Sequence, residues 1–374
     1  MDFDYVVMPV IILALGMLII WLSVRRMRSL STKAHPTWRK VAERFAFSIV
    51  VFLAVAVVGS SSFNAIALHR FWALNPAPGR IVEIDGHKMH IYCTGSGSPT
   101  IVLEAGAGND SVVWRGVQPV LSKTTRVCSY DRAGSGWSDK VPGPRDADHV
   151  ADQLHQLLTQ VGITDPVVLM GHSIGGIYLR DYATRFPQQV EGLVLVDSAT
   201  PFQDKAPGME GGRLGPPFWV VSVAMKAGVP RLLGMCTEGA KGTEDRIRKL
   251  QAEANCRLHS GVMSAEVDSF DQSSQQTVRS GPYGALAILV ISHDPSKMPT
   301  PQTQQDMNRQ KAWSRMQEDL KKLSTRSRRV VAKGSMHDVM LDRPDLIENE
   351  VPLFIEQIRG TVPQPTNYGS TITE

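Results

Sequence analysis

Two long apolar stretches open the chain. Residues 6–24 are uncharged and almost wholly apolar, and at about 1.5 Å per helical residue they just cross a hydrocarbon core of roughly 30 Å. A second stretch, 45–68, begins with FAFSIVVFLAVAVV and becomes more polar through Gly59, three serines and Asn64. We predict two transmembrane helices in a membrane anchor that covers residues 1–78.

Each stretch has an alternative interpretation as a removable signal peptide. The first lacks the usual basic start, because Asp2 and Asp4 precede it and arginines follow it directly. The second follows a basic segment and runs into Ala65-Ile66-Ala67, which imitates a cleavage site. We favour a membrane anchor in both cases, and cleavage of the second stretch stays open.

The segment between the two stretches is strongly basic. Within residues 25–44, seven lysines and arginines stand against the single acid Glu43. Basic residues near the ends of spans stay on the cytoplasmic side. We therefore predict that both termini, and the large part of the chain after residue 70, lie on the extracytoplasmic side, where disulfides can persist.

From Arg80 onward, short apolar runs alternate with helical patterns, which predicts a mostly parallel sheet with helices on both faces. Eight strands are expected, at 81–84, 90–93, 100–103, 126–130, 166–170, 192–196, 285–291 and 329–332. Residues 79–199 and 285–360 then form one α/β domain. Residues 200–284 are predicted to be a helical cap insertion, and the polar residues 361–374 a disordered tail.

Charge and cysteine spacing exclude two classes of function. The formal net charge is +4, but residues 25–44 alone contribute +6, so the remainder is slightly acidic. The part of the chain outside residues 25–44 therefore lacks the excess of positive charge that binds DNA or RNA. The four cysteines show no CxxC pair, which argues against a zinc site, and we expect no metal or organic cofactor.

The segment Gly171-His172-Ser173-Ile174-Gly175 is the only GxSxG match in the chain. It follows the apolar strand PVVLM and begins a helical pattern. A nucleophile elbow requires this strand-to-helix context, because side chains at the flanking glycines would collide with neighbouring backbone. Ser173 is therefore the predicted nucleophile. The alternative, a phosphate-binding turn, lacks both the P-loop ending and GxGxxG.

A serine hydroxyl becomes a good nucleophile only when a base accepts its proton, and an imidazole does this well at neutral pH. His337 follows the last predicted strand, in KGSMHDVMLDRPDLI, and is the predicted base, whereas the ring of His172 should point away from the elbow. A carboxylate should orient the base. We prefer Asp294, which follows the seventh strand, and Asp197, which follows the sixth, stays open as the alternative acid.

Hydrolysis of an acyl bond also needs backbone amides that bind the oxyanion of the intermediate. One amide comes from the residue after the nucleophile and one from the loop after the third strand. These positions are Ile174 and Ala107, the latter in LEAGAGNDSVVW.

The segments IVLEAGAGNDSVVW, YDRAGSGWSD, VLMGHSIGG and MHDVMLDRPDL resemble successive signatures of α/β-hydrolase superfamily serine hydrolases, of esterase or lipase type. The resemblance covers about residues 80–200 and 285–360. It implies the α/β-hydrolase fold with a cap, the nucleophile Ser173, the base His337 and oxyanion amides at Ala107 and Ile174. The Asp131-Arg132 segment is also similar to epoxide hydrolases and haloalkane dehalogenases, but their nucleophile is an aspartate.

The expected activity is hydrolysis of a carboxylic ester, or a related acyl bond, in a small molecule or lipid. One alternative is a proline-releasing aminopeptidase, which would need a carboxylate cluster in the cap to hold a free amine. Another is a non-catalytic binding protein, because a fold does not fix a function. In the implied fold the second and fourth strands are neighbours, so we hypothesise a Cys93–Cys128 disulfide, together with a Cys236–Cys256 disulfide inside the cap.

Overall fold

The computed structural model of the chain forms two compact units. It describes residues 3–32, 37–209, 218–237, 245–257, 260–297, 303–365 and 368–374. One unit, here called the helical unit, consists of Met1–Pro76 and Pro216–Thr237, and the other, the α/β unit, of Ala77–Gly215 and Glu238–Glu374.

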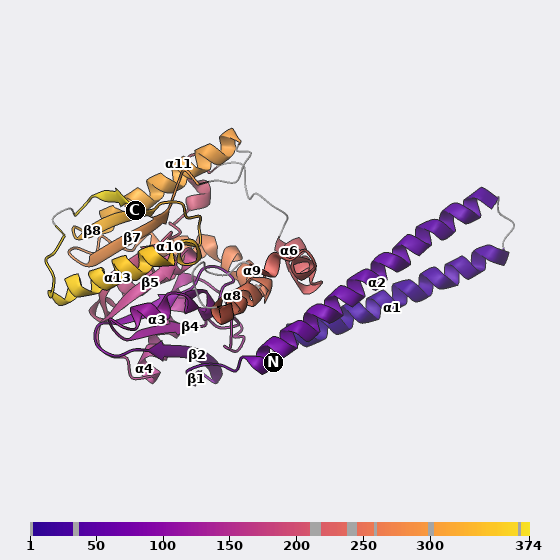
Figure 1. Ribbon diagram of the computed structural model, residues 1–374, viewed down its shortest axis with the longest axis horizontal. Helices are drawn as coiled ribbons and strands as arrows, with labels where there is room; N and C mark the ends of the chain where they lie inside the picture. The colour runs from indigo at the N-terminus through magenta and orange to yellow at the C-terminus, as the bar shows by residue number, and fades with distance from the viewer. Residues whose placement is uncertain are drawn as a thin grey trace. The chain divides into compact units, whose positions relative to one another are not determined.

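Two long helices lie side by side and antiparallel in the helical unit (Figure 1). They are α1 (Phe3–Thr32) and α2 (Thr37–Leu74), and both are long and apolar enough to cross a membrane. The two predicted apolar helices are therefore confirmed, each longer at both ends than predicted. The same unit contains α6 (Phe218–Lys226), α7 (Val229–Leu232) and the 3-10 turn η4 (Met235–Thr237), which the sequence analysis placed in the cap.

A nine-stranded sheet forms the centre of the α/β unit, in the order β1-β2-β4-β3-β5-β6-β7-β8-β9. Strands β1 and β2 pair antiparallel, as do β2 and β4, and the remaining pairs are parallel. All eight predicted strands are present, as β1 (Arg80–Ile84), β2 (His87–Thr94), β3 (Thr100–Glu104), β4 (Val127–Tyr130), β5 (Val167–His172), β6 (Val190–Val196), β7 (Ala287–His293) and β8 (Ser327–Ala332).

Helices cover both faces of this sheet, because strand side chains alternate between the faces and most of those in the central strands β3 to β7 are apolar. In β3, Ile101 and Leu103 pack into one core cluster and Val102 into the other. The first cluster includes α3 (Gln118–Leu121), α12 (Val339–Asp342) and α13 (Pro344–Arg359), and the second includes α4 (Ala147–Gln160) and α5 (Ile174–Arg185) (Figure 1).

The remaining helices belong mainly to the insertion between β6 and β7 and to the segment before β8. They are α8 (Asp245–Arg257), α9 (Ser260–Asp268), α10 (Phe270–Thr277) and α11 (Gln304–Asp319), with the 3-10 turns η1 (Ser111–Arg115), η2 (Pro187–Gln189), η3 (Gln203–Lys205) and η5 (Leu320–Leu323). Helix α11 begins at a capping box, in which Thr303 and Asp306 bond reciprocally to each other's backbone amides.

The C-terminal tail differs from the disordered segment that its polar composition predicts. Strand β9 (Thr371–Thr373) pairs in parallel with β8, and Ile372 packs against the core. Without it, β8 would leave a row of unpaired backbone groups at the edge of the sheet. The pairing of a three-residue strand depends on that edge, which composition alone does not reveal.

The predicted Cys93–Cys128 disulfide is present, at directly opposed positions of β2 and β4. Cys236 is also disulfide-bonded. The side chain of Cys256 lies outside the described residues, so the Cys236–Cys256 pair stays a prediction.

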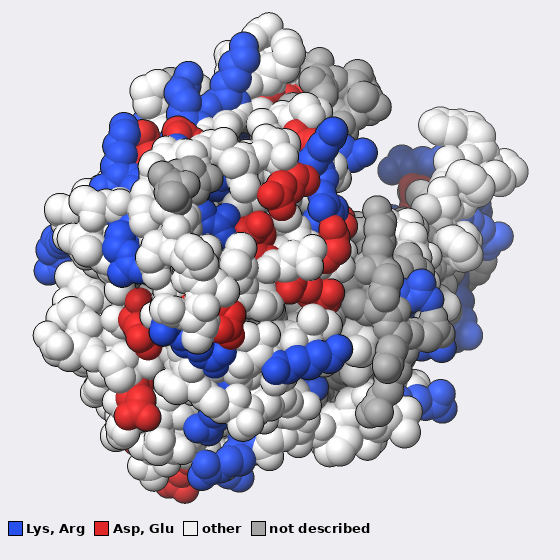
Figure 2. Space-filling model, turned by 60° about the vertical axis from the view of Figure 1, so that its left-hand side comes forward, with Lys and Arg blue, Asp and Glu red and all other residues white. Residues whose placement is uncertain are grey.

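Surface charges on the α/β unit are mixed. On the face drawn in Figure 2, lysine and arginine side chains are interspersed with aspartate and glutamate.

Candidate active site

Ser173 lies at a sharp turn between β5 and α5. Its backbone is in the positive-φ region, at φ 54° and ψ −126°, which is rare for a residue with a side chain and is characteristic of a nucleophile elbow. Gly175 permits this turn, because a Cβ atom there would lie 2.8 Å from the carbonyl oxygen of Ala105. The predicted strand–Ser–helix context is therefore the observed one, and Ser173 itself is half-buried.

Asp197, the alternative acid of the sequence analysis, is the carboxylate that binds His337. Nδ1 of His337 donates to Oδ2 of Asp197 at 2.6 Å, which leaves Nε2 of the ring free of this bond. The Asp197 side chain is fully buried, whereas 45% of the His337 side chain is exposed. Asp197 directly follows β6, the neighbour of the strand that leads to Ser173, and itself has a positive φ of 42°.

Asp294, the preferred acid, is used elsewhere. It accepts hydrogen bonds from the amide and hydroxyl of Ser296 at 2.9 and 2.6 Å, and from the amide of Gly334 at 2.8 Å. These bonds connect the loop after β7 to the loop after β8, which carries His337. Asp294 thus holds two loops together near the site, whereas Asp197 contacts the imidazole of His337.

Two further side chains donate to Asp197. His293, the last residue of β7, directs Nδ1 to both carboxylate oxygens at 2.8 and 2.9 Å, and Nε1 of Trp313 donates at 2.9 Å. The Trp313 ring also meets the His337 ring edge to face, with centroids 5.7 Å apart. Asp197 is thereby fixed from three sides.

These contacts set the protonation states around Asp197. Burial alone would raise the pKa of Asp197, but hydrogen bonds from His293 and His337 lower it well below its ordinary value. Burial alone would lower the pKa of His337, but the bond to Asp197 and its charge raise it above the ordinary value. The pKa of His293 is raised in the same way. Asp197 is therefore ionised at neutral pH.

The His172 ring supports the loop that carries His337. Its Nε2 donates to the backbone carbonyl of His337 at 3.0 Å, and the two rings lie 4.6 Å apart. Burial, with a smaller contribution from the charge of His337, lowers the pKa of His172 to about 4, so its ring is neutral at neutral pH. The expectation that this ring points away from the site is not what the structure shows.

The loop that contains Ala107 is held by a buried arginine. The Arg132 guanidinium donates to the carbonyls of Ala105 and Gly106 at 2.7 and 2.8 Å. The loop lies against the elbow, since a Cβ atom at Gly106 would be 3.3 Å from Cβ of Ser173. In a planar trans peptide the carbonyl and the following N–H point in opposite directions. Arg132 therefore directs the amide of Ala107 away from itself.

Glu266 of α9 completes this arrangement from the insertion. Its carboxylate accepts from Nε of Arg132 at 2.7 Å and from the amide of Gly108 at 2.9 Å. A second buried carboxylate, Glu104, pairs with the same guanidinium. Arg132, Glu104 and Glu266 are all buried. The peptides on both sides of Ala107 are thus fixed by one ion-paired cluster.

The amide of Ile174 is positioned by the elbow itself. Ile174 is the first residue of α5, so its N–H has no acceptor one turn earlier in the helix. The N-terminal end of a helix also attracts negative charge.

Sequence reasoning missed four residues of this site: His293, Trp313, Arg132 and Glu266. Trp313 and Glu266 come from helices far along the chain, and no local pattern marks them. Arg132 stands in the YDRAGSGWSD signature, so its resemblance to other hydrolases was the one available signal.

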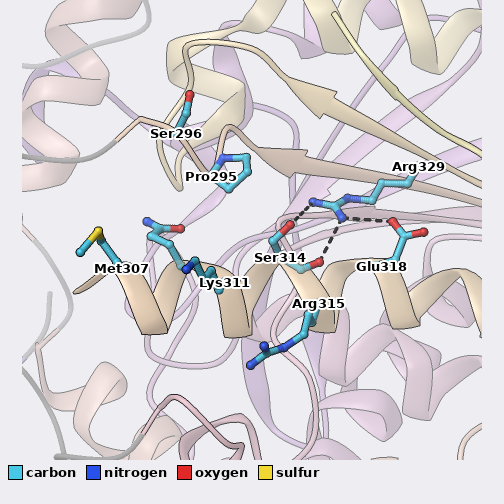
Figure 3. A pocket seen from close by; sticks show the side chains of 9 residues that line it. Pro295, Ser296, Met307, Lys311, Ser314, Arg315, Glu318 and Arg329 are labelled. Atoms are coloured by element: carbon cyan, nitrogen blue, oxygen red, sulfur yellow. Dashed lines mark hydrogen bonds and ion pairs between the residues drawn. The ribbon is translucent and has the colours of Figure 1, made fainter. Parts of the chain in front are cut away.

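A hollow of about 690 Å³ lies beside this site, between α11 and the loop after β7 (Figure 3). Most of the residues that line it are polar or charged, and Arg329 points toward Ser314 and Glu318 within it. Gln310, another lining residue, contacts Nε2 of His293 at 2.7 Å. Neither Ser173 nor His337 lines the hollow, so we do not assign the reacting ester to it.

Comparison with known proteins agrees with the observed fold. A family model described as alpha/beta hydrolase fold matches residues 99–228. The chain has the α/β-hydrolase fold, with its mixed, mostly parallel sheet, and is similar to proteins of the α/β-hydrolase superfamily.

Similar proteins are found among sequences and solved structures. An uncharacterised protein of Schizosaccharomyces pombe is 28% identical over 344 residues, which cover 83% of this chain and 62% of that protein. A crystal structure of a membrane phospholipase A is similar with a TM-score of 0.57 at 20% identity, covering 85% of this chain and 99% of that one. An esterase from Thermogutta terrifontis is similar with a TM-score of 0.51 at 19% identity, covering 75% and 99%. The chain spans about half the length of the curated relatives it matches.

Proposed function

We propose that this protein is a membrane-anchored serine hydrolase that cleaves a carboxylic ester, or a related acyl bond, through an acyl-enzyme. The observation that carries the proposal is the 2.6 Å bond between His337 and the buried Asp197, together with a serine in nucleophile-elbow geometry whose amide donates to the carbonyl of Val196, the residue before Asp197. The match of residues 99–228 to the alpha/beta hydrolase fold family model and the similar esterase and phospholipase structures support it.

In this mechanism Oγ of Ser173 attacks the ester carbonyl while Nε2 of His337 takes the serine proton. Asp197 holds Nδ1–H of His337 and stabilises the imidazolium. The amides of Ile174 and Ala107 bind the oxyanion of the tetrahedral intermediate. His337 then protonates the departing alcohol. Water, deprotonated by His337, hydrolyses the acyl-enzyme and releases the acid, with no metal or organic cofactor.

A fluorophosphonate probe tests this proposal, because it reacts with an activated serine whatever the substrate is. We expect membranes containing the wild-type protein to be labelled and the Ser173→Ala variant to remain unlabelled. Thermal unfolding of both proteins is the control for folding. If neither folded protein reacts, the hydrolase proposal fails and a non-catalytic binding role replaces it.

The aminopeptidase alternative requires free carboxylates in the insertion. Glu266 is one carboxylate of this insertion, and it is bonded to Arg132 and to the amide of Gly108. Glu210, Glu238 and Glu244 lie outside the described residues. Parallel assays of an acetate ester and a prolyl amide separate the two activities, and faster cleavage of the amide would favour the peptidase.

We further propose that the α/β unit faces the extracytoplasmic side. The basic residues of segment 25–44, most of them in the adjoining ends of α1 and α2, and the Cys93–Cys128 disulfide support this orientation. On intact cells, a membrane-impermeant amine reagent should label Lys322, which is 79% exposed, and leave Lys40 between the spans unlabelled. The reverse pattern, read by mass spectrometry of peptides, would invert the orientation.

A further inference from the structure

The polar residues that interrupt the apolar part of α2 are bonded to the end of α6. The side chains of Ser60, Ser61 and Asn64 donate to three consecutive backbone carbonyls, at residues 225–227, over 2.5, 3.3 and 3.3 Å. All three side chains belong to buried residues of an otherwise largely exposed helix. Helix α6 is thus attached to α2 through hydrogen bonds and not through apolar packing alone.

These bonds satisfy two needs at once. The last carbonyls of a helix have no partner within it, and α6 ends at Lys226. Serine and asparagine in a membrane span are costly unless they find hydrogen-bond partners. Gly228 permits the close approach, because a Cβ atom there would lie 2.8 Å from Cβ of Asn64. Arg231 adds a bond from its Nε to Oδ1 of Asn64 at 3.0 Å.

The depth of this attachment follows from helix geometry. Arg44 is the last charged residue before the apolar part of α2. At about 1.5 Å per residue, Ser60 lies roughly 24 Å and Asn64 roughly 30 Å further along the helix axis. A hydrocarbon core is about 30 Å thick. If Arg44 marks one boundary of the bilayer, α6 meets α2 at the opposite boundary.

The segment that contains α6 and α7 exposes large apolar side chains at the depth where α6 meets α2. In the interfacial segment, defined here as residues 218–236, the most exposed are Leu233 at 69%, Leu232 at 63%, Met235 at 61% and Val223 at 53%. Lys226 and Arg231 lie among them. Apolar side chains beside basic ones are typical of segments that lie in the lipid headgroup region, where long basic side chains reach the phosphates.

We propose that the interfacial segment lies in the bilayer boundary remote from the basic segment 25–44, as a second membrane attachment, and that the enzyme hydrolyses acyl lipids of that leaflet. The segment is inserted in the chain between β7 and β6, the strand that Asp197 directly follows. The chain on both sides of the segment continues into the α/β unit, so a segment bound to the membrane is a second link between that unit and the lipid. The substrate class rests on the proposed hydrolase function, and the position of the segment does not.

Photo-crosslinking tests the position on the full chain. The protein is placed in phosphatidylcholine vesicles that contain a phospholipid with a diazirine in its acyl chain, and adducts are mapped by mass spectrometry. We expect adducts on the interfacial segment as well as on α1 and α2, and none at Val278, an exposed apolar residue of the α/β unit. Adducts on α1 and α2 alone would overturn the proposal, as would crosslinks between two copies of the segment.

A pair of matched variants tests the substrate class. We compare hydrolysis of a long-chain ester within vesicles with hydrolysis of a short soluble ester. In the double variant Leu232→Asp/Leu233→Asp, we expect the ratio of the two rates to fall about tenfold. In Val278→Asp the ratio should not change. A ratio unchanged in both variants would overturn the lipid substrate.

The fluorophosphonate experiment distinguishes failure of the proposed hydrolase function from failure of the proposed membrane position of the segment. Absence of serine labelling removes the hydrolase function and the lipid substrate with it, while lipid adducts on the interfacial segment would still establish its position. Serine labelling without such adducts leaves a hydrolase that does not use this segment at the membrane.

Discussion

Replacing Asp197 by asparagine should lower kcat for ester hydrolysis by about 10⁴-fold. Asp197 accepts hydrogen bonds from His337, His293 and Trp313 at the same time. An asparagine presents one oxygen and one NH₂ group, so at least one of these donors would face another donor. If that donor is His337, its ring changes tautomer or orientation, and Nε2 no longer accepts the proton of Ser173.

The control for this prediction is Asp294→Asn, the other acid that the sequence suggested. Its bonds are to Ser296 and the amide of Gly334, so we expect a change in kcat of less than about tenfold. Thermal unfolding of both variants separates a catalytic loss from misfolding. A large loss in Asp294→Asn with little loss in Asp197→Asn would reverse the assignment.

The pH dependence of the wild type and of Asp197→Asn provides a second measurement. His337 acts as a base only when neutral, so kcat/KM should rise with pH through its pKa. Asp197 raises that pKa above its ordinary value of about 6.5, so the wild-type midpoint should lie above this pH. In Asp197→Asn the midpoint of the residual activity should move to lower pH. An unchanged midpoint would mean that the Asp197 charge does not act on the catalytic base.

Replacing Arg132 by lysine should lower kcat by about 10²-fold with little change in KM. The lysine keeps the positive charge between Glu104 and Glu266, so both buried carboxylates remain compensated. It cannot hold the carbonyls of Ala105 and Gly106 in the forked geometry of a guanidinium. The amide of Ala107 would then lose its fixed direction, and with it part of the oxyanion stabilisation.

Arg329→Lys is the matched control for Arg132→Lys. Arg329 is also a buried arginine that bonds to several acceptors, among them Ser292, Ser314 and Glu318, but none of them belongs to the loop of Ala107 (Figure 3). Its substitution should lower the midpoint of thermal unfolding with little effect on kcat. If both variants lose stability equally and neither loses kcat, Arg132 has a structural role only.

Local sequence determined much of this protein. The sequence predicted the eight strands, the turn at Ser173 and the two apolar helices, because each depends on a short pattern. These patterns are the period of apolar residues, two glycines around a serine, and the length of an uncharged run. The place of His337 after the last long strand predicted its contact with a carboxylate, and its role as the base stays a prediction. The strand in the polar tail was not predicted, because β9 forms only where the edge of β8 is available.

Tertiary structure decided what the sequence left open. Asp197 and Asp294 both follow parallel strands, and chain order does not say which carboxylate meets His337; the strand order and the loop after β8 do. Glu266 reaches Arg132 across 134 residues of sequence, so no local pattern could pair them. The polar residues at 60–64 looked like the weak end of a transmembrane helix. Only the folded chain shows that they bind the end of α6, because hydrogen-bond partners are set by proximity in space and not in sequence.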